Sequence, residues 1–284
     1  MELRTGLPLF NAPGLGAAPA VRGNVYRADG PGPAAMKRPL VQRLREGGPA
    51  SFGTWVSTSS PVCLDALDGL GFDWFMIDTE HAHVNPETLA QLVALQRPRT
   101  GAALVRVGEV DQYLVKTALD TGAEGVLVPL VNTEAEARRA VSYAKYPPDG
   151  VRGIASAAST QFGKDLAGYL RRANSETLVG VQIETREALA NVDAIAAVAG
   201  VDVLFVGPQD LTLNLGLVDN RKDPLVRDAL RRVAESAARH GKAAGTLVVD
   251  AEEKKTAVDL GYRFIGLASD VRFLLNGARA LLAA

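Results

Sequence analysis

The sequence holds a single cysteine, Cys63, and only three histidines among its 284 residues. One cysteine excludes an intrachain disulfide, so no residue requires an oxidising compartment. No apolar run approaches the roughly 20 residues that a helix needs to span a bilayer. The formal net charge is −1, from 31 basic and 32 acidic residues, which argues against a polyanion-binding surface. These absences predict a soluble cytoplasmic protein that binds neither nucleic acid nor membrane.

The first 37 residues differ in composition from the rest of the chain. They contain five prolines among many glycines and alanines, without a sustained helical or strand period. A secretory signal peptide is the alternative, but Asn11, Pro13 and Gly14 interrupt what would be its apolar segment. We therefore predict an N-terminal extension over residues 1–37, disordered or in contact with a neighbouring subunit, and one catalytic domain over residues 38–284. A short helix is expected at the junction, over Ala34–Glu46.

Beyond Ser51 the chain alternates apolar strand-like runs with helical patterns. The predicted strands are Phe52–Val56, Trp74–Ile77, Ala103–Val107, Gly125–Leu130, Leu178–Ile183, Val203–Val206, Ala243–Val249 and Phe264–Leu267. The predicted helices are Pro61–Leu70, Pro86–Leu95, Gln112–Thr121, Glu134–Tyr146, Ala188–Val198, Leu225–His240, Ala251–Leu260 and Asp270–Ala283. Strict alternation of eight strands with eight helices predicts a (β/α)8 TIM barrel.

A doubly wound open sheet is the alternative architecture for an alternating chain. No Gly-x-Gly-x-x-Gly motif opens a helix in this sequence, so dinucleotide binding has no support. The segment Pro147–Asn174 is longer than an ordinary connection, and long loops of barrels are usually functional. We therefore expect this segment to contribute to function.

Two of the apolar runs end abruptly in a carboxylate. Val179–Ile183 leads into Glu184, and Val201–Gly207 leads through Pro208 and Gln209 into Asp210. In a barrel, neighbouring strand ends converge on one mouth, and carboxylate oxygens there suit Mg²⁺ or Mn²⁺. The alternative is that both acids are solvated loop residues. Their matched positions favour the metal site.

Other polar residues fall at the same predicted rim. His81 follows the second strand, with His83 as its competitor, and either could be a base or a solvated loop histidine. Arg106 ends an apolar run and therefore needs an anion, which could be a structural aspartate or a substrate oxygen. Gln182 lies near the end of the fifth strand. His240 is expected to end a helix, where the helix dipole favours it.

The ordered set of motifs resembles the HpcH/HpaI family of class II pyruvate aldolases. The matching stretches run in family order from about Ser51 onward: Phe72–Ala82, Leu104–Val107, Leu127–Val131, Tyr146–Gly153, Val181–Thr185 and Phe205–Leu211. Each stretch is weak by itself, but the ordered set is specific. The resemblance implies aldol cleavage or condensation of a 4-hydroxy-2-oxo acid to pyruvate and an aldehyde, through a metal-bound pyruvate enolate.

The resemblance also implies roles for particular residues. Glu184 and Asp210 match the ligands of a divalent metal ion (Mg²⁺, Mn²⁺ or Co²⁺), and Arg106 matches the residue that holds the enolate oxygen. His81 matches the catalytic base and Asp120 its carboxylate partner. The residues that match the substrate site are Gln182, Gly207, Gln209 and Asp210. The family further implies a homo-hexamer or similar homo-oligomer that exchanges C-terminal helices.

The departures from the family pattern concern the aldehyde. Thr79 replaces a common glycine, Gln209 replaces what is often a small or amide residue, and Ser156–Lys164 lacks the basic character expected for a carboxylated aldehyde. Three alternatives stay open. They are an oxaloacetate decarboxylase or enolate-transfer enzyme of specialised metabolism, a CoA-ester lyase, and a non-catalytic barrel that serves as a scaffold.

Overall fold

The structure is a computed structural model that describes residues 38–97, 99, 101–218 and 220–283. The predicted extension over residues 1–37, including the start of the predicted helix Ala34–Glu46, lies outside them. The first helix, α1 (Leu40–Arg45), begins directly after Pro39. Arg38 and Pro39 are therefore not helical, although the predicted helix included them. The reason is that proline disfavours helical backbone in the residue before it and cannot donate to a preceding turn.

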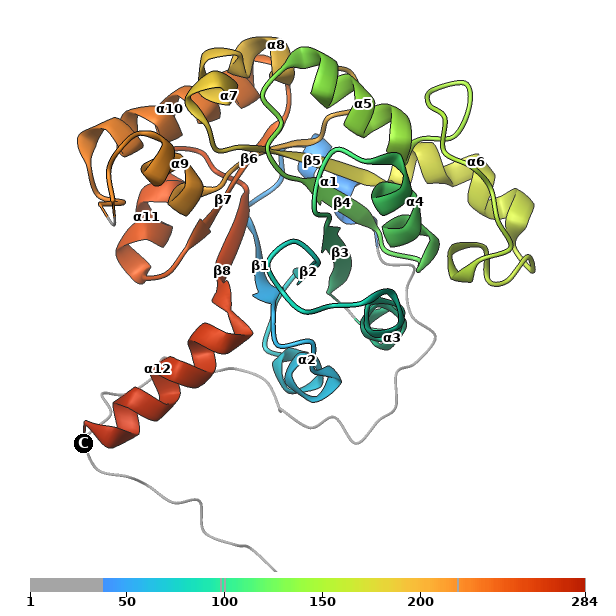
Figure 1. Cartoon of the computed structure of the whole chain (residues 1–284), viewed down its shortest axis with the longest axis horizontal. Coiled ribbons are helices and arrows are strands. Elements are labelled where there is room, and N and C mark those ends of the chain that lie inside the picture. Colours follow the sequence, from blue (N-terminus) through green and yellow to red (C-terminus); the bar gives the residue numbers. More distant parts are fainter. Residues whose placement is uncertain (1–37, 98, 100, 219, 284) are drawn as a thin grey trace, which may run out of the picture. The chain divides into compact units, whose positions relative to one another are not determined.

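Eight parallel strands close into a barrel in sequence order (Figure 1). The strands are β1 (Ser51–Val56), β2 (Trp74–Asp78), β3 (Ala102–Arg106), β4 (Gly125–Val128), β5 (Leu178–Ile183), β6 (Val203–Val206), β7 (Ala243–Val248) and β8 (Phe264–Ser269). The predicted (β/α)8 barrel is therefore confirmed. β4 ends before Pro129, two residues earlier than predicted, because proline has no N–H to continue a strand ladder.

Helices alternate with these strands around the barrel (Figure 1). Their bounds are α2 (Pro61–Leu67), α3 (Pro86–Gln96), α4 (Gln112–Asp120), α5 (Glu134–Ala144), α6 (Leu166–Glu176), α7 (Arg186–Ala190), α8 (Val192–Ala196), α9 (Pro208–Asn214), α10 (Pro224–Arg239), α11 (Ala251–Asp259) and α12 (Asp270–Leu282). The predicted helix Ala188–Val198 is two helices, α7 and α8, divided at Asn191. Neither α6, α9 nor the 3₁₀ turn η1 (Ala158–Thr160) was predicted. No helix in the described residues has the length and apolar character of a membrane span.

Large rings fill the interior of the barrel. Trp74 stacks on Phe264 with ring centroids 4.1 Å apart, and both are buried. The ring of Trp74 occupies the space where a side chain at Gly53 would stand, since a Cβ there would lie 2.0 Å from it. A second apolar layer packs the outer face of the strands against the helices. The interior is thus a packed core, and chemistry is confined to its ends.

Helix α1 closes the end of the barrel at which the strands begin. Its Leu40 and Leu44 belong to the same apolar cluster as the interior rings. Arg43 pairs with Asp73 at 2.9 Å, and Leu44 O accepts a hydrogen bond from Arg263 Nη1 at 2.7 Å. The open mouth is therefore the opposite end, at which the strands finish.

Helix α12 extends from the barrel after a firm anchor at its first residue (Figure 1). The buried carboxylate of Asp270 accepts the backbone N–H groups of Ser57 and Thr58, each at 3.0 Å. The apolar side chains beyond this anchor are exposed and recur at helical spacing: Val271, Leu274, Leu275, Leu281 and Leu282. An apolar stripe on one helix face is the pattern that packs against another element.

Candidate active site

Three strands end at or beside polar residues at the open mouth, and a fourth is followed there by a glycine. Asp78 at the end of β2 pairs in register with Arg106 at the end of β3. Gln182 lies in β5, Glu184 directly follows that strand, and Gly207 directly follows β6. Because all the strands are parallel, these residues share one rim. The predicted convergence of Arg106, Gln182 and Glu184 is therefore present.

Two carboxylates hold the guanidinium of Arg106. Its Nε lies 2.9 Å from Asp78 Oδ1, its Nη2 lies 2.7 Å from Asp78 Oδ2, and its Nη1 lies 3.0 Å from Glu80 Oε2. Burial by itself lowers the pKa of Arg106, but the two carboxylates outweigh burial and raise that pKa above its ordinary value. Arg106 is consequently a fixed, permanent cation at the rim.

Asp78 also shapes the loop that carries His81. Its Oδ1 accepts the backbone N–H groups of Glu80 and His81, at 3.1 and 3.3 Å. Thr79, the residue that departs from the family pattern, donates its hydroxyl to Arg106 O at 2.6 Å. The end of β2, the end of β3 and the histidine loop are thus joined by hydrogen bonds.

Asp78 and Glu80 are two residues of this rim for which the sequence predicted no role. The sequence feature that could have identified Asp78 is Arg106 itself, because a buried arginine needs an anionic partner. A residue at the matching position of the neighbouring strand can supply that partner. Asp78 stands at that position. The two possible partners foreseen for Arg106 were a structural aspartate and a substrate oxygen, and the structural aspartate is present.

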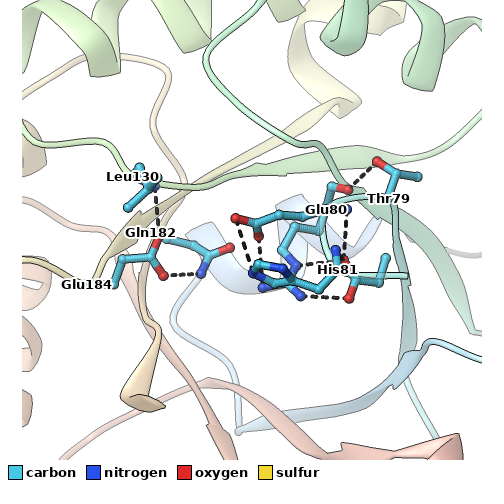
Figure 2. A network of polar contacts seen from close by, with 8 residues as sticks. Thr79, Glu80, His81, Leu130, Gln182 and Glu184 are labelled. Atoms are coloured by element: carbon cyan, nitrogen blue, oxygen red, sulfur yellow. Dashed lines mark hydrogen bonds and ion pairs between the residues drawn. The ribbon is translucent and has the colours of Figure 1, made fainter. Parts of the chain in front are cut away.

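The two histidines of the loop are both accessible. The His81 side chain is 65% exposed, and its Nε2 lies 3.5 Å from Glu80 Oε1 (Figure 2). His83 is also exposed, and its backbone oxygen accepts the hydroxyl of Ser59 at 3.2 Å. His81 is therefore the histidine that belongs to the polar network. His240 caps the end of α10, as predicted.

Glu184 is buried, with only 2% of its surface exposed. Its Oε1 accepts the backbone N–H of Leu130 at 2.8 Å, and its Oε2 accepts Gln182 Nε2 at 2.6 Å (Figure 2). Burial raises the pKa of Glu184 to about 7, helped by Asp210 and Glu80 and opposed by the Leu130 bond. Without a cation, this carboxyl group is partly protonated at neutral pH.

The backbone beside Glu184 is unusual at two places. Leu130 has φ 52°, in the left-handed region, which costs a non-glycine residue about 1–3 kcal/mol and clusters at functional sites. At Gly207, a Cβ would lie 2.3 Å from Glu184 Oε2 and 3.1 Å from Gln182 Nε2. Only glycine therefore leaves room for the carboxylate in its present position.

Helix α9 begins immediately after Gly207 and carries two predicted substrate or metal residues. The backbone N–H groups of Gln209 and Asp210 lie in its first turn, where a helix supplies no acceptor. The Asp210 side chain is exposed, and its charge raises the pKa of Glu184 and of Glu80. Asp210 is thus close enough to Glu184 for the two carboxylates to interact.

The charges at the mouth fit a divalent cation. Asp78 and Arg106 neutralise each other, which leaves three further acidic groups at the mouth, Glu80, Glu184 and Asp210. A cation on Glu184 and Asp210 would replace the proton that burial now favours on Glu184. No three acidic, histidine or cysteine side chains converge as a metal cage within the described residues. Magnesium is typically bound by one or two carboxylates together with substrate and water, so two are sufficient.

Asp120 lies at the other end of the barrel. It is the last residue of α4, and β4 begins shortly after it, at Gly125. Its Oδ1 accepts Arg152 Nη2 at 2.9 Å. A five-residue strand rises about 3.3 Å per residue, so roughly 15 Å separates this end from the mouth. Among the described residues of one chain, Asp120 and His81 therefore share no contact.

The long segment Pro147–Asn174 also lies away from the mouth. It connects α5 to the start of β5, and it contains η1 and most of α6 rather than an open loop. Its Arg152 is buried, 4.7 Å from the ring centroid of Tyr146, and its Nη1 donates to Tyr169 OH at 3.0 Å. Within one chain, this segment therefore contacts the predicted site residue Asp120, through Arg152, at the end of the barrel away from the mouth. A functional role for the segment stays a prediction.

Comparison with known proteins connects this geometry to one family. The model of the HpcH/HpaI aldolase/citrate lyase family matches residues 51–277. A 4-hydroxy-2-oxo-heptane-1,7-dioate aldolase of Escherichia coli is 38% identical over 250 residues, covering 87% of this chain and 95% of its own.

Two solved structures are similar as well. An HpcH/HpaI aldolase/citrate lyase family protein of Burkholderia cenocepacia superposes with a TM-score of 0.82 at 35% identity, covering 86% of this chain and 97% of that one. Macrophomate synthase superposes with a TM-score of 0.78 at 27% identity, covering 88% and 90%. The similarity therefore extends over the whole barrel.

Proposed function

The chain belongs to the HpcH/HpaI aldolase/citrate lyase family of carbon–carbon lyases, and from this membership we propose that it is a metal-dependent pyruvate aldolase. The proposed reaction is reversible cleavage of a 4-hydroxy-2-oxo acid to pyruvate and an aldehyde. One observation carries it: a buried carboxylate, Glu184, and a fixed cation, Arg106, share one rim with an excess of negative charge. That combination suits a reaction in which an enolate forms beside a divalent cation.

Glu184 and Asp210 would hold the cation, which supplies Lewis-acid polarisation of the 2-oxo group when bound. Gln182 holds the Glu184 carboxylate in place through its 2.6 Å hydrogen bond. The first-turn N–H groups of Gln209 and Asp210 are donors for the substrate carboxylate, since helix N-termini favour anions. These residues together orient the pyruvate half of the substrate.

Arg106 meets the charge that develops during cleavage. As the C3–C4 bond breaks, its electron pair moves toward C2 and negative charge collects on the C2 oxygen. A guanidinium has five N–H bonds, of which two, on Nε and Nη2, donate to Asp78, while Nη1 forms an ion pair with Glu80. N–H bonds on Nη1 and Nη2 are therefore left for this oxygen. Because Asp78 fixes the guanidinium beforehand, no reorganisation is needed when the charge appears.

His81 is the proposed base for the C4 hydroxyl proton. An imidazole suits this step because its ordinary pKa lies near neutral pH. The proposed carboxylate partner, Asp120, lies at the far end of the same barrel, so it could reach His81 only from another copy of the chain. The proposal therefore includes a homo-oligomer, such as a hexamer. The exposed apolar stripe of α12 supports exchange of C-terminal helices within it.

A second candidate is decarboxylation of oxaloacetate with transfer of the enolate to another acceptor. The structural similarity to macrophomate synthase favours it. Both reactions need the same cation, Arg106 and enolate. They differ in the group that leaves as the enolate forms, an aldehyde or CO2, and in the acceptor that the enolate then attacks. Product analysis with oxaloacetate, compared with a panel of aldehydes and pyruvate, separates them.

Exchange of pyruvate methyl protons with solvent tests the shared part of both candidates. We expect wild-type protein with Mg²⁺, Mn²⁺ or Co²⁺ to catalyse the exchange. The double substitution Glu184→Ala with Asp210→Ala should abolish both metal binding and exchange. Exchange at the wild-type rate in the double variant would show that the reaction does not pass through a metal-assisted enolate.

A further inference from the structure

Glu80 stands at the centre of the polar network, although the proposed mechanism gives it no task. It is 14% exposed and places one oxygen 3.0 Å from Arg106 Nη1 and the other 3.5 Å from His81 Nε2 (Figure 2). Its backbone is held in place, because its N–H donates to Asp78 Oδ1 at 3.1 Å. Glu80 therefore contacts both residues that the mechanism uses for charge and proton transfer.

One oxygen of Glu80 has hydrogen-bonding capacity to spare. Its Oε2 is buried, yet it accepts no hydrogen bond from the described residues. The contact with Arg106 Nη1 is an ion pair without the angle of a hydrogen bond. A buried carboxylate oxygen in this condition costs free energy unless a ligand or water donates to it.

Glu80 also interacts electrostatically with both proposed metal ligands. Burial raises the pKa of Glu80. The positive charges of Arg106 and His81 lower this pKa, and the negative charges of Asp78 and Asp210 raise it further. Glu80 in turn raises the pKa of Glu184. The absence of any three-residue metal cage in the described part of the chain argues that Glu80 is not a third direct ligand.

We propose that Glu80 is an outer-shell carboxylate of the metal site, which strengthens cation binding by its charge while it positions Arg106 and His81. This inference rests on the proposed metal-dependent function. The inference goes beyond the proposed function because it assigns part of the cation affinity to a residue that makes no bond to the cation. Residues of this kind typically change metal affinity by 10- to 100-fold, through field and hydrogen bonding alone.

Binding of Mn²⁺, followed by electron paramagnetic resonance of the free ion, tests the inference without any substrate. Glu80→Gln keeps the shape of the side chain and removes its charge, so the dissociation constant for Mn²⁺ should rise about tenfold or more. Glu80→Asp retains the charge and should recover part of the affinity. Glu87→Gln is the matched control, because Glu87 is an exposed acid in the first turn of α3, and it should bind Mn²⁺ like wild type.

Thermal unfolding of the metal-free proteins separates this role from a merely structural one. Neutralising a carboxylate in an acid-rich site removes repulsion, so metal-free Glu80→Gln should melt no lower than wild type. An unchanged Mn²⁺ affinity would overturn the inference, and so would a weaker affinity accompanied by a lower melting temperature. A wild-type protein that binds no Mn²⁺ would instead refute the proposed function itself, and this inference with it.

Discussion

Arg106 meets Asp78 edge to edge across the ends of β3 and β2, with Nε and Nη2 each within 2.9 Å of a different carboxylate oxygen. Such a bidentate pair fixes both the position and the plane of the guanidinium. The two partners are in register, so the orientation of Arg106 is built into the pairing of two barrel strands. The arginine is thereby prepared before any substrate arrives.

Arg106→Lys should therefore preserve the fold and lose most of the activity. A lysine ammonium is a point charge that cannot form the paired contact with Asp78 and still face the mouth with two donors. We expect pyruvate proton exchange to fall on the order of 10²–10³-fold, the usual cost of losing one preorganised donor. Circular dichroism checks the fold, and near-wild-type exchange would contradict the assigned role.

Metal affinity should rise with pH up to about pH 7 and then level off. The pKa of Glu184 is about 7 in the folded metal-free protein, against an ordinary value of 4.5, so a cation must displace a proton below pH 7. The raised pKa also means that the stability contributed by this group is present below pH 4.5 and lost as pH rises through 7.

Titration of Mn²⁺ at a series of pH values checks this expectation. Well below pH 7 the affinity should change by nearly tenfold per pH unit, with about one proton released for each cation bound. The contribution of Glu184 to the thermal stability of the metal-free protein should fall as pH rises from about 4.5 through 7. A saturating cation should oppose that loss. A flat pH dependence of affinity would mean that Glu184 is ionised before the cation binds.

Gly207→Ala should weaken metal binding without direct contact with the cation. The added methyl group would lie 2.3 Å from Glu184 Oε2, so the carboxylate has to move, and overpacking of this kind costs about 1–3 kcal/mol. Gly277→Ala is the control, since nothing lies within 4 Å of that position in α12. The control should melt slightly higher, because alanine favours a helix by roughly 1 kcal/mol over glycine. Equal Mn²⁺ affinities for the two variants would contradict the steric argument.

Mixing two inactive variants tests whether Asp120 acts across subunits. His81→Ala and Asp120→Ala should each be inactive alone. In mixed oligomers, roughly a quarter of the sites would pair an intact His81 with an intact Asp120 of another copy. Activity should return to about that level after the two proteins are dissociated and reassembled together. A mixture without activity would leave Asp120 only its ion pair with Arg152.

The strands were predictable because a barrel strand is buried on both faces and is therefore uniformly apolar. Leu178–Ile183 and Val203–Val206 have the predicted bounds for this reason. Helix α6 was missed because glycines and prolines precede it, and these indicate a loop although the apolar helical pattern resumes at Leu166. Helix α9 has only seven residues and follows β6 almost directly, so its sequence is too short to show a helical pattern and is interpreted as a loop at the mouth.

The rim residues were predictable in part. A carboxylate after an apolar run, as at Glu184, is visible in the sequence because it has no reason to be buried alone. The cluster of Asp78 and Glu80 around Arg106 depends on register between strands, which residue spacing does not reveal. The separation of Asp120 from His81 likewise depends on the direction of α4, which carries Asp120 back to the far end.

Helix α1 bears on the order in which the chain acquires its structure. It closes the barrel by contacts with residues far along the chain, including Arg45 with Asp202 and Leu44 with Arg263. Asp202 and Arg263 directly precede β6 and β8, and Asp73, the partner of Arg43, directly precedes β2. Because these strands lie on both sides of the junction between β1 and β8, α1 gains its contacts only once the barrel exists. We expect the helix nearest the start of the domain to dock last, although it is synthesised first. Pulse-labelled hydrogen exchange should show its amides protected after those of β2, β6 and β8.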